Sequence, residues 1–184
     1  MSLKNTDEEI ISSYKNGNIE IFKLLVNRYT SPVFNFTARF TGKGNAPDAT
    51  QEVFIKVWKK IDNFDPKKSS FKTWIFTIAK NTSIDFLRKS GKITTFTDLE
   101  KEEDSFAETI TDEGILPDES VQKLQDKDFL NNLLDHLSTE YKTVLVLHYQ
   151  EEMTFDEISK ILKKPLNTIK SYHHRAILKL RKMI

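Results

Sequence analysis

The 184-residue sequence contains no cysteine and only five glycines and five prolines. The absence of cysteine excludes disulfides and thiolate metal sites, and it fits a reducing compartment. Thirteen phenylalanines beside so few turn-forming residues indicate helices with aromatic cores rather than a turn-rich sheet. No apolar run approaches membrane-spanning length, and the first ten residues lack the apolar region of a signal peptide. We therefore expect a soluble, cytoplasmic, all-α protein without membrane insertion.

Acidic side chains are also missing from residues 158–184, which carry eight lysines and arginines. Residues 1–92 are basic as well, with 16 Lys and Arg against nine Asp and Glu, whereas residues 93–125 hold two and ten. The acidic segment has no sustained apolar period, which is typical of a linker. The acidic charge either solvates a spacer, or mimics nucleic acid or repels it from a groove. The sequence predicts two small helical domains, 1–92 and 126–184, joined by an acidic linker at 93–125.

Apolar periodicity predicts four helices in the first domain, at about residues 7–15, 19–38, 48–61 and 71–89. Thr6 and Glu9 have the spacing of a capping box at the start of the first helix. Pro32 is expected to bend or split the second helix. In the third helix the apolar residues repeat every three or four positions, at Phe54, Val57, Trp58 and Ile61. This stripe predicts that Phe54 and Trp58 are buried.

The second domain is predicted to contain helices at about residues 126–136, 139–149, 154–162 and 167–184. Thr154 and Glu157 form a second capping box, and residues 163–166 turn the chain before the last helix. One face of that helix carries Lys170, Ser171, His174 and Arg175, away from an apolar stripe. A recognition helix uses such a face to reach base edges in the major groove. The alternative is a solvated basic face, but the absence of acids favours DNA.

Two blocks of residues resemble the bacterial sigma factors of RNA polymerase. The sequence TFDEIS at 154–159, followed by NTIKS at 167–171 and HRA at 174–176, is similar to region 4 of that family. The sequence DATQEVFIKVW at 48–58 is similar to region 2, and its continuation lies in residues 71–88. The blocks occur in family order and at family spacing. The chain length and the absence of a separate region 3 domain resemble the extracytoplasmic-function (ECF) group of the sigma-70 family.

The resemblance implies a promoter-specificity subunit that needs no catalytic residue, cofactor or metal. Its partners would be core RNA polymerase, promoter DNA and an anti-sigma factor. It implies polymerase contacts at Asp48, Gln51, Glu52 and Lys56. The duplex −35 element would be read by Thr168, Lys170, Ser171, His174 and Arg175. The unpaired −10 strand would meet Asn63, Phe64, Lys67, Lys68, Asn81, Asp85 and Arg88, since aromatic rings beside cations hold unstacked bases.

Structural roles are the alternative for several of these residues. Trp74 and Phe64 could both be core residues. Core packing is expected for Trp74, whereas DNA contact is favoured for Asn81 and for the loop at residues 63–70, which includes Phe64. Asp85 and Arg88 have the spacing of a surface ion pair. The sequence departs from the family at Tyr172, where arginine is usual, and at His173, where an inward-facing leucine or isoleucine is usual. These departures leave the preferred promoter sequence open.

Three other functions compete with this hypothesis. A stand-alone helix-turn-helix regulator explains residues 138–184 but gives residues 48–58 no purpose. An adaptor that binds only protein predicts no salt-dependent affinity for DNA. A metalloenzyme could use histidine ligands, but the spacing of the four histidines is not that of a zinc site. The four are His136, His148, His173 and His174.

Overall fold

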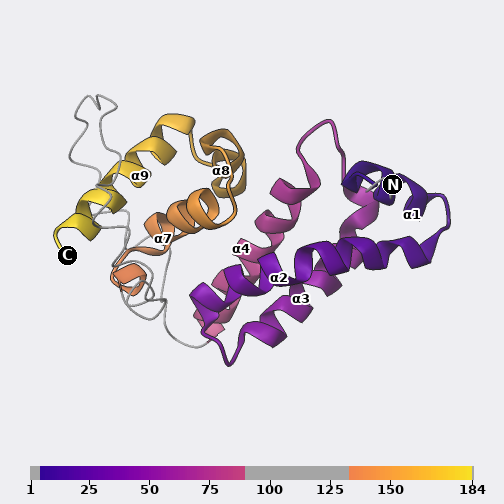
Figure 1. Cartoon of the computed structure of the whole chain (residues 1–184), viewed down its shortest axis with the longest axis horizontal. Coiled ribbons are helices and arrows are strands. Elements are labelled where there is room, and N and C mark those ends of the chain that lie inside the picture. Colours follow the sequence, from indigo (N-terminus) through magenta and orange to yellow (C-terminus); the bar gives the residue numbers. More distant parts are fainter. Residues whose placement is uncertain (1–4, 90–132, 184) are drawn as a thin grey trace. The chain divides into compact units, whose positions relative to one another are not determined.

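The computed structural model describes residues 5–89 and 133–183, and these residues form helices and turns without a β-strand. They belong to two compact units, one built from α1 to α4 and the other centred on α7 and α9 (Figure 1). The expected all-α fold is therefore confirmed for the described part of the chain. The expected linker, 93–125, and most of the expected helix at 126–136 lie outside the described residues.

The first unit contains four α-helices and two short 3-10 turns. They are α1 (Asp7–Lys15), η1 (Ile19–Ile21), α2 (Phe22–Thr41), α3 (Ala46–Lys60), η2 (Ile61–Asn63) and α4 (Phe71–Lys89). Each of α2, α3 and α4 packs against the other two. Their shared core buries Leu25, Val33, Phe36, Val53, Val57, Ile75 and Phe76. The predicted capping box on α1 is present, because Thr6 Oγ1 accepts from the Glu9 amide and Glu9 Oε2 accepts from the Thr6 amide.

Pro32 lies inside α2, which continues through it as one 20-residue helix. Of the two expected effects, bending or splitting, splitting is therefore wrong. A proline removes one backbone donor and crowds the preceding turn. Here both halves of the helix are held by burial, with Leu25 and Tyr29 before the proline and Val33 and Phe36 after it. Tertiary packing outweighs the local cost of the proline.

The buried side of α3 differs from the predicted stripe. Its buried residues are Ala46, Ala49, Thr50, Val53 and Val57. Phe54 is only half-buried and Trp58 is 55% exposed, so the prediction that they are buried is wrong. Because α2 and α4 both pack on α3, the side facing them carries small and β-branched residues. The larger aromatic side chains lie at the edge of that interface or outside it.

The second unit contains α7 (Thr139–Leu145), a π-helical turn η3 (Val146–Gln150), α8 (Phe155–Leu162) and α9 (Leu166–Arg181). The ends of α8 and the start of α9 agree with the sequence prediction to within one residue. Ser138 caps α7 by accepting a hydrogen bond from the Tyr141 amide. The core of this unit includes Tyr141, Val144, Leu147, Met153, Ile158, Ile161, Ile169 and Ala176. In this unit α7 packs against α9.

Candidate polymerase and nucleic-acid interfaces

Helices α8 and α9 are joined by the tight turn of a helix-turn-helix. Thr154 Oγ1 accepts from the Glu157 amide at 3.3 Å, and Glu157 Oε2 accepts from the Thr154 amide at 2.9 Å. The predicted capping box is therefore confirmed. Lys163 adopts a left-handed backbone with φ of 55°, which lets the chain reverse direction within three residues. Pro165 then immediately precedes the first turn of α9.

Four of the five DNA-reading candidates of α9 lie on its outer half. The inner side buries Ile169, Ala176, Ile177 and Leu180. At 100° per residue Thr168, Ser171, His174 and Arg175 fall on the opposite half of the helix, and Lys170 lies at its border. Lys170 is exposed and the other four are half-buried. The candidates comprise the exposed Lys170 ammonium, the Arg175 guanidinium and three shorter polar groups, at Thr168, Ser171 and His174.

The two residues that depart from the sigma-factor pattern do not belong to this polar face. The Tyr172 ring lies 5.3 Å from that of Tyr141, which is buried in α7. His173 Nε2 is 2.9 Å from the Tyr149 hydroxyl. The rings of Tyr149, His148 and Phe155 surround His173 at 5.1–5.6 Å. Both residues therefore fix how α9 sits on α7, η3 and α8.

The outer side of α3 forms a mixed polar and apolar stripe, which we call the α3 face: Asp48, Gln51, Glu52, Ile55 and Trp58. Asp48 and Gln51 are exposed, and Glu52 is half-buried. Ile55 and Trp58 are 44% and 55% exposed. Ile55 and Trp58 were not predicted as surface residues, because the predicted apolar stripe lies one position away from the true core side. The small residues Ala46, Ala49 and Val53 were the signal that could have located that side.

The Lys56 ammonium contacts side chains of α3 and α4 within the first unit. Its Nζ lies 2.8 Å from Glu52 Oε1 and 3.6 Å from Asp85 Oδ2, and it donates to Thr82 Oγ1 at 3.1 Å. The hydrogen bond from Lys56 lowers the pKa of the Glu52 carboxyl below its ordinary value. The structure thus brings together Glu52 and Lys56, two polymerase candidates, with Asp85, a −10 candidate.

The loop at residues 63–70, which begins with the last residue of η2 and precedes α4, contains four −10 candidates, and Phe64 differs from the others in burial. Asn63, Lys67 and Lys68 are exposed, whereas Phe64 is 4% exposed. Its ring contacts those of Phe71 and Trp74 at 5.6 and 5.5 Å. A base cannot stack on Phe64 unless this aromatic cluster opens. Phe64 therefore anchors the loop. Trp74 packs on this cluster but is only half-buried, so its expected core role is met in part.

The remaining −10 candidates lie on α4. Asn81 and Arg88 are exposed, and Asn81 Oδ1 accepts a hydrogen bond from Lys80 at 3.2 Å. Asp85 faces Lys56, so the structure pairs it with α3 rather than with Arg88 as the surface-bridge alternative supposed. Ser70 caps this helix by accepting from the Thr73 amide at 3.2 Å.

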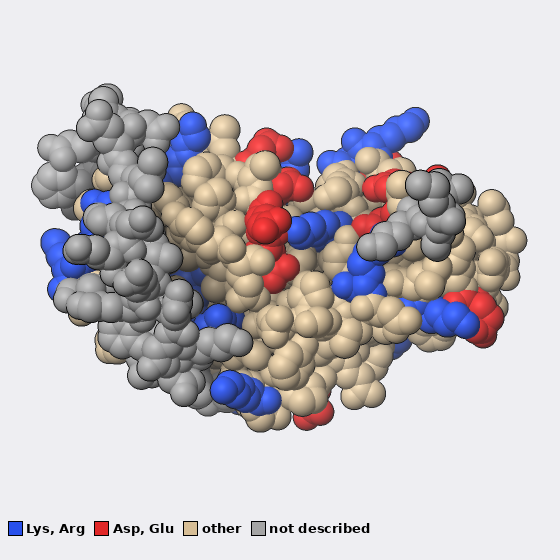
Figure 2. Space-filling view, viewed as in Figure 1, with Lys and Arg blue, Asp and Glu red and all other residues tan. Residues whose placement is uncertain are grey.

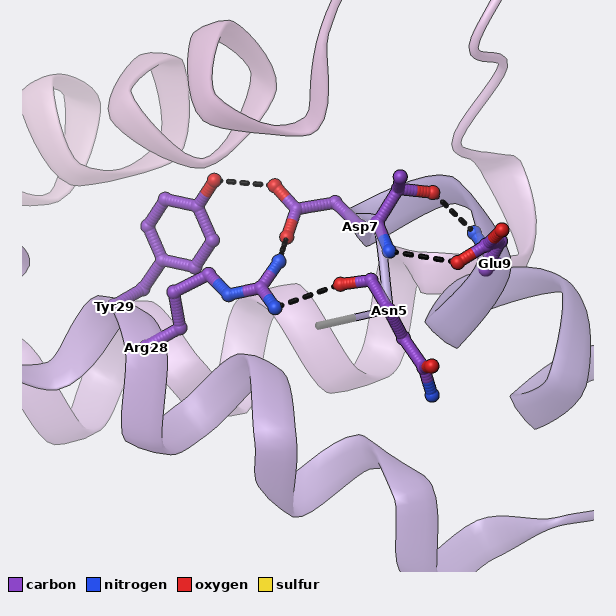
Figure 3. Close-up of polar contacts among 6 residues, drawn as sticks. Asn5, Asp7, Glu9, Arg28 and Tyr29 are labelled. Carbon is purple, nitrogen blue, oxygen red and sulfur yellow. Dashed lines mark hydrogen bonds and ion pairs between the residues drawn. The ribbon is translucent and has the colours of Figure 1, made fainter. Parts of the chain in front are cut away.

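Helix α1 is tied to both α2 and the loop that precedes α4. The Asp7 carboxylate accepts from the Arg28 guanidinium and from the Tyr29 hydroxyl, and Arg28 Nη2 donates to the Asn5 carbonyl at 2.8 Å (Figure 3). Burial, reinforced by the hydrogen bond to Asp7, raises the pKa of Tyr29 far above its ordinary value. At the other end of α1, Lys15 Nζ donates to the Asp62 and Phe64 carbonyls at 3.0 and 3.1 Å.

On the face shown in Figure 2, Lys and Arg side chains lie at several separate places, and several of the Asp and Glu side chains lie next to one another. In the described part of the chain, His, Asp and Glu side chains nowhere form a group of three that could hold a metal ion. Within residues 5–89 and 133–183, each helix is too short or too polar to span a lipid bilayer.

Family comparisons agree with these two units. Sigma-70 region 2 matches residues 25–93, and sigma-70 region 4 matches residues 130–180. The ECF RNA polymerase sigma factor SigW of Bacillus subtilis is 33% identical over 178 residues, covering 95% of this chain and 94% of that protein. The ECF RNA polymerase sigma-E factor of Escherichia coli K12 is 28% identical over 181 residues, covering 96% of this chain and 93% of that protein.

Two solved structures share the fold. One is CnrH in complex with the cytosolic domain of CnrY, with a TM-score of 0.69, 22% identity and 97% coverage of both chains. The other is the sigma factor RpoE in complex with the anti-sigma factor NepR from Bartonella quintana. It has a TM-score of 0.63 and 24% identity, and it covers 88% of this chain and 94% of that one.

The helix-turn-helix and the matches to sigma-70 regions 2 and 4 together define a DNA-binding transcription initiation factor. The chain belongs to the ECF group of the sigma-70 family, since its match to such relatives runs over nearly its whole length. It is a promoter-recognition subunit of bacterial RNA polymerase. The family membership therefore accounts for the chain better than a stand-alone regulator or a protein-only adaptor.

Proposed function

We propose a division of labour between the two units. Residues 1–92 dock on core polymerase and hold the unpaired non-template strand of the −10 element. Residues 126–184 read the −35 duplex with the outer half of α9. The acidic segment 93–125 links the two activities along the polymerase. The observation that carries this proposal is that each unit turns a polar or mixed face away from its own core, on α3 and on α9.

The α3 face would bind polymerase through two kinds of contact. Asp48, Gln51 and Glu52 supply polar groups, and the exposed Ile55 and Trp58 extend the surface with apolar area. Tryptophan in a partly exposed position is a frequent energetic centre of protein interfaces. Lys56 contributes indirectly, because its ion pair orients the Glu52 carboxylate.

The −10 strand would meet Asn63, Lys67 and Lys68 of the loop and Asn81 and Arg88 of α4, all of which are exposed. Phe64 supports this surface from beneath. Because these groups would bind bases only in the melted promoter, they favour the open state in proportion to their affinity for it. No covalent step is needed, so the chain would act by binding alone.

In the duplex, Lys170 and Arg175 are the residues suited to guanine N7 and O6, and each good contact contributes about 1–3 kcal/mol of discrimination. Thr168, Ser171 and His174 would complete the surface by contacting bases or phosphates. An anti-sigma factor is a further expected partner, because one of the similar structures is a sigma factor bound by one. The cytoplasm is the expected location, since polymerase and promoter are found there.

The proposal is tested by transcription with purified core polymerase over a library randomised at both promoter elements. The wild-type chain should select one −10 and one −35 sequence. Gln51→Ala should reduce initiation at every promoter by weakening assembly, whereas Lys170→Ala should change only the −35 preference. Loss of both preferences in either single variant would contradict the division of labour.

A further inference from the structure

Lys15 at the end of α1 holds the backbone on both sides of Asn63. Its Nζ donates to the carbonyl of Asp62 at 3.0 Å and to the carbonyl of Phe64 at 3.1 Å. Asn63 itself is exposed, whereas the next residue, Phe64, is buried in the aromatic cluster. The backbone around Asn63 is therefore fixed from two directions while its side chain stays accessible.

Helix α1 is anchored well enough to serve as a support. Ile10 and Ile11 are buried, and the Asp7 carboxylate accepts from Arg28 and Tyr29 of α2 (Figure 3). The Tyr29 ring in turn contacts Phe71 edge-on at 5.2 Å. Phe71 begins α4 and touches Phe64. The two ends of α1 are thus connected to the loop at its start, near Asn63, and at its end, near Phe71. Helix α1 itself precedes the region 2 match at residues 25–93.

We propose that Lys15 is a positioning residue for −10 recognition, acting through Asn63. By tying two carbonyls to α1, it sets the direction in which the Asn63 amide meets an unpaired base. An amide can tell bases apart only if its donor and acceptor are held in a fixed orientation, and a loop already ordered spends less of its binding energy on ordering. This inference rests on the proposed role of the loop in −10 binding.

The test uses the full chain assembled with core polymerase and a promoter library randomised in the −10 non-template strand. Lys15→Met should flatten the base preference at one −10 position by about threefold to tenfold, the scale of one hydrogen bond. The −35 preference and the affinity for core polymerase should stay at wild-type values. Lys15→Arg, which can donate to both carbonyls, should restore much of the preference.

Lys23→Met is the matched control, because Lys23 is exposed on α2 and pairs only at the surface with Glu20 at 3.2 Å. It should behave like the wild type. Asn63→Ala should flatten the same −10 position as Lys15→Met. In the double variant, Lys15→Met should add no further loss at that position, since its effect passes through the Asn63 side chain.

The outcomes separate the two proposals. If Asn63→Ala changes the −10 preference but Lys15→Met matches Lys23→Met, the role of Lys15 is overturned and the role of the loop stands. If Asn63→Ala leaves every −10 preference intact, the loop is not the reading element and both proposals fall. If Lys15→Met lowers initiation equally on all sequences and also lowers the melting temperature, Lys15 is a stabilising residue only, which overturns the inference.

Discussion

Lys56 of α3 and Asp85 of α4 form an ion pair between the two helices, with 3.6 Å between Nζ and Oδ2. The same ammonium lies 2.8 Å from Glu52 Oε1 and donates to Thr82. A polymerase candidate, Glu52, and a −10 candidate, Asp85, therefore share one cation. A substitution at Lys56 should therefore affect both the polymerase candidate Glu52 and the −10 candidate Asp85.

Replacing Lys56 with methionine is expected to destabilise the first unit modestly. The side chains concerned are about one-third to one-half exposed, so the loss should be about 0.5–1 kcal/mol, at the upper end for surface pairs. Urea denaturation of the full chain measures it. Lys59→Met, on an exposed position of the same helix, is the matched control. Equal midpoints for the two variants would mean that the Lys56 contacts contribute no stability.

The pKa of Glu52 gives a second prediction for the same contact. Lys56 lowers this pKa in the folded chain below the ordinary 4.5. The stabilisation from the pair is therefore fully present above pH 4.5 and is lost as the pH falls through the folded pKa. Carboxyl NMR titration should show the Glu52 pKa rising towards its ordinary value in Lys56→Met. A Glu52 pKa that does not move on this substitution would show that Lys56 is not its cause.

Phe64 is expected to support the loop from within rather than to stack on DNA. Phe64→Ala should lower the free energy of unfolding by about 3–5 kcal/mol, as for other buried phenylalanines. Phe64→Leu should cost less than about 1.5 kcal/mol and should keep −10 binding, because leucine fills much of the space without an aromatic face. Equilibrium unfolding and binding to a forked −10 template measure the two effects. A Phe64→Leu variant that is stable but has lost −10 binding would show that the ring itself touches a base.

Trp58 is expected to matter for polymerase binding and little for folding. Since the side chain is 55% exposed, Trp58→Ala should change stability by no more than about 0.5 kcal/mol. If Trp58 is an energetic centre of the interface, the affinity for core polymerase should fall by about 2 kcal/mol, or roughly thirtyfold. Fluorescence anisotropy of labelled protein titrated with polymerase measures this. Asn27→Ala, at an exposed position on α2, is the control, and equal affinities for the two variants would remove Trp58 from the interface.

Lys170 is expected to read a base rather than a phosphate. Lys170→Ala should relax the preference at one −35 base pair, at a cost of about 1–3 kcal/mol for the preferred base. Lys182→Ala, which removes the same charge beyond the end of α9, should leave the base preference unchanged. Competition binding with single-base −35 variants at fixed salt separates the two. Uniform weakening across all sequences in Lys170→Ala, with a smaller salt dependence, would assign Lys170 to the DNA backbone.

Several features were predictable because they depend on residues close together in the chain. The capping boxes Thr6–Glu9 and Thr154–Glu157 fix helix starts through contacts three residues apart. The outer and inner halves of α9 follow from helical periodicity alone. The region 2 and region 4 sequence motifs each lie within short segments of the chain. Through these local rules, the sequence by itself determined three things. The chain is helical, it contains a helix-turn-helix, and it belongs with the sigma factors.

Other features depend on which helices pack together, and only the tertiary structure decided them. Packing against α2 and α4 determines which side of α3 is buried, and it leaves Trp58 exposed. Phe64 packs in a cluster with Phe71 and Trp74. Lys56 pairs with Asp85, which is 29 residues further along the chain. Lys15 donates to the carbonyls on either side of Asn63, which are 47 and 49 residues further along. Such contacts have no local signature, because their free energy comes from groups that meet only after the core has formed.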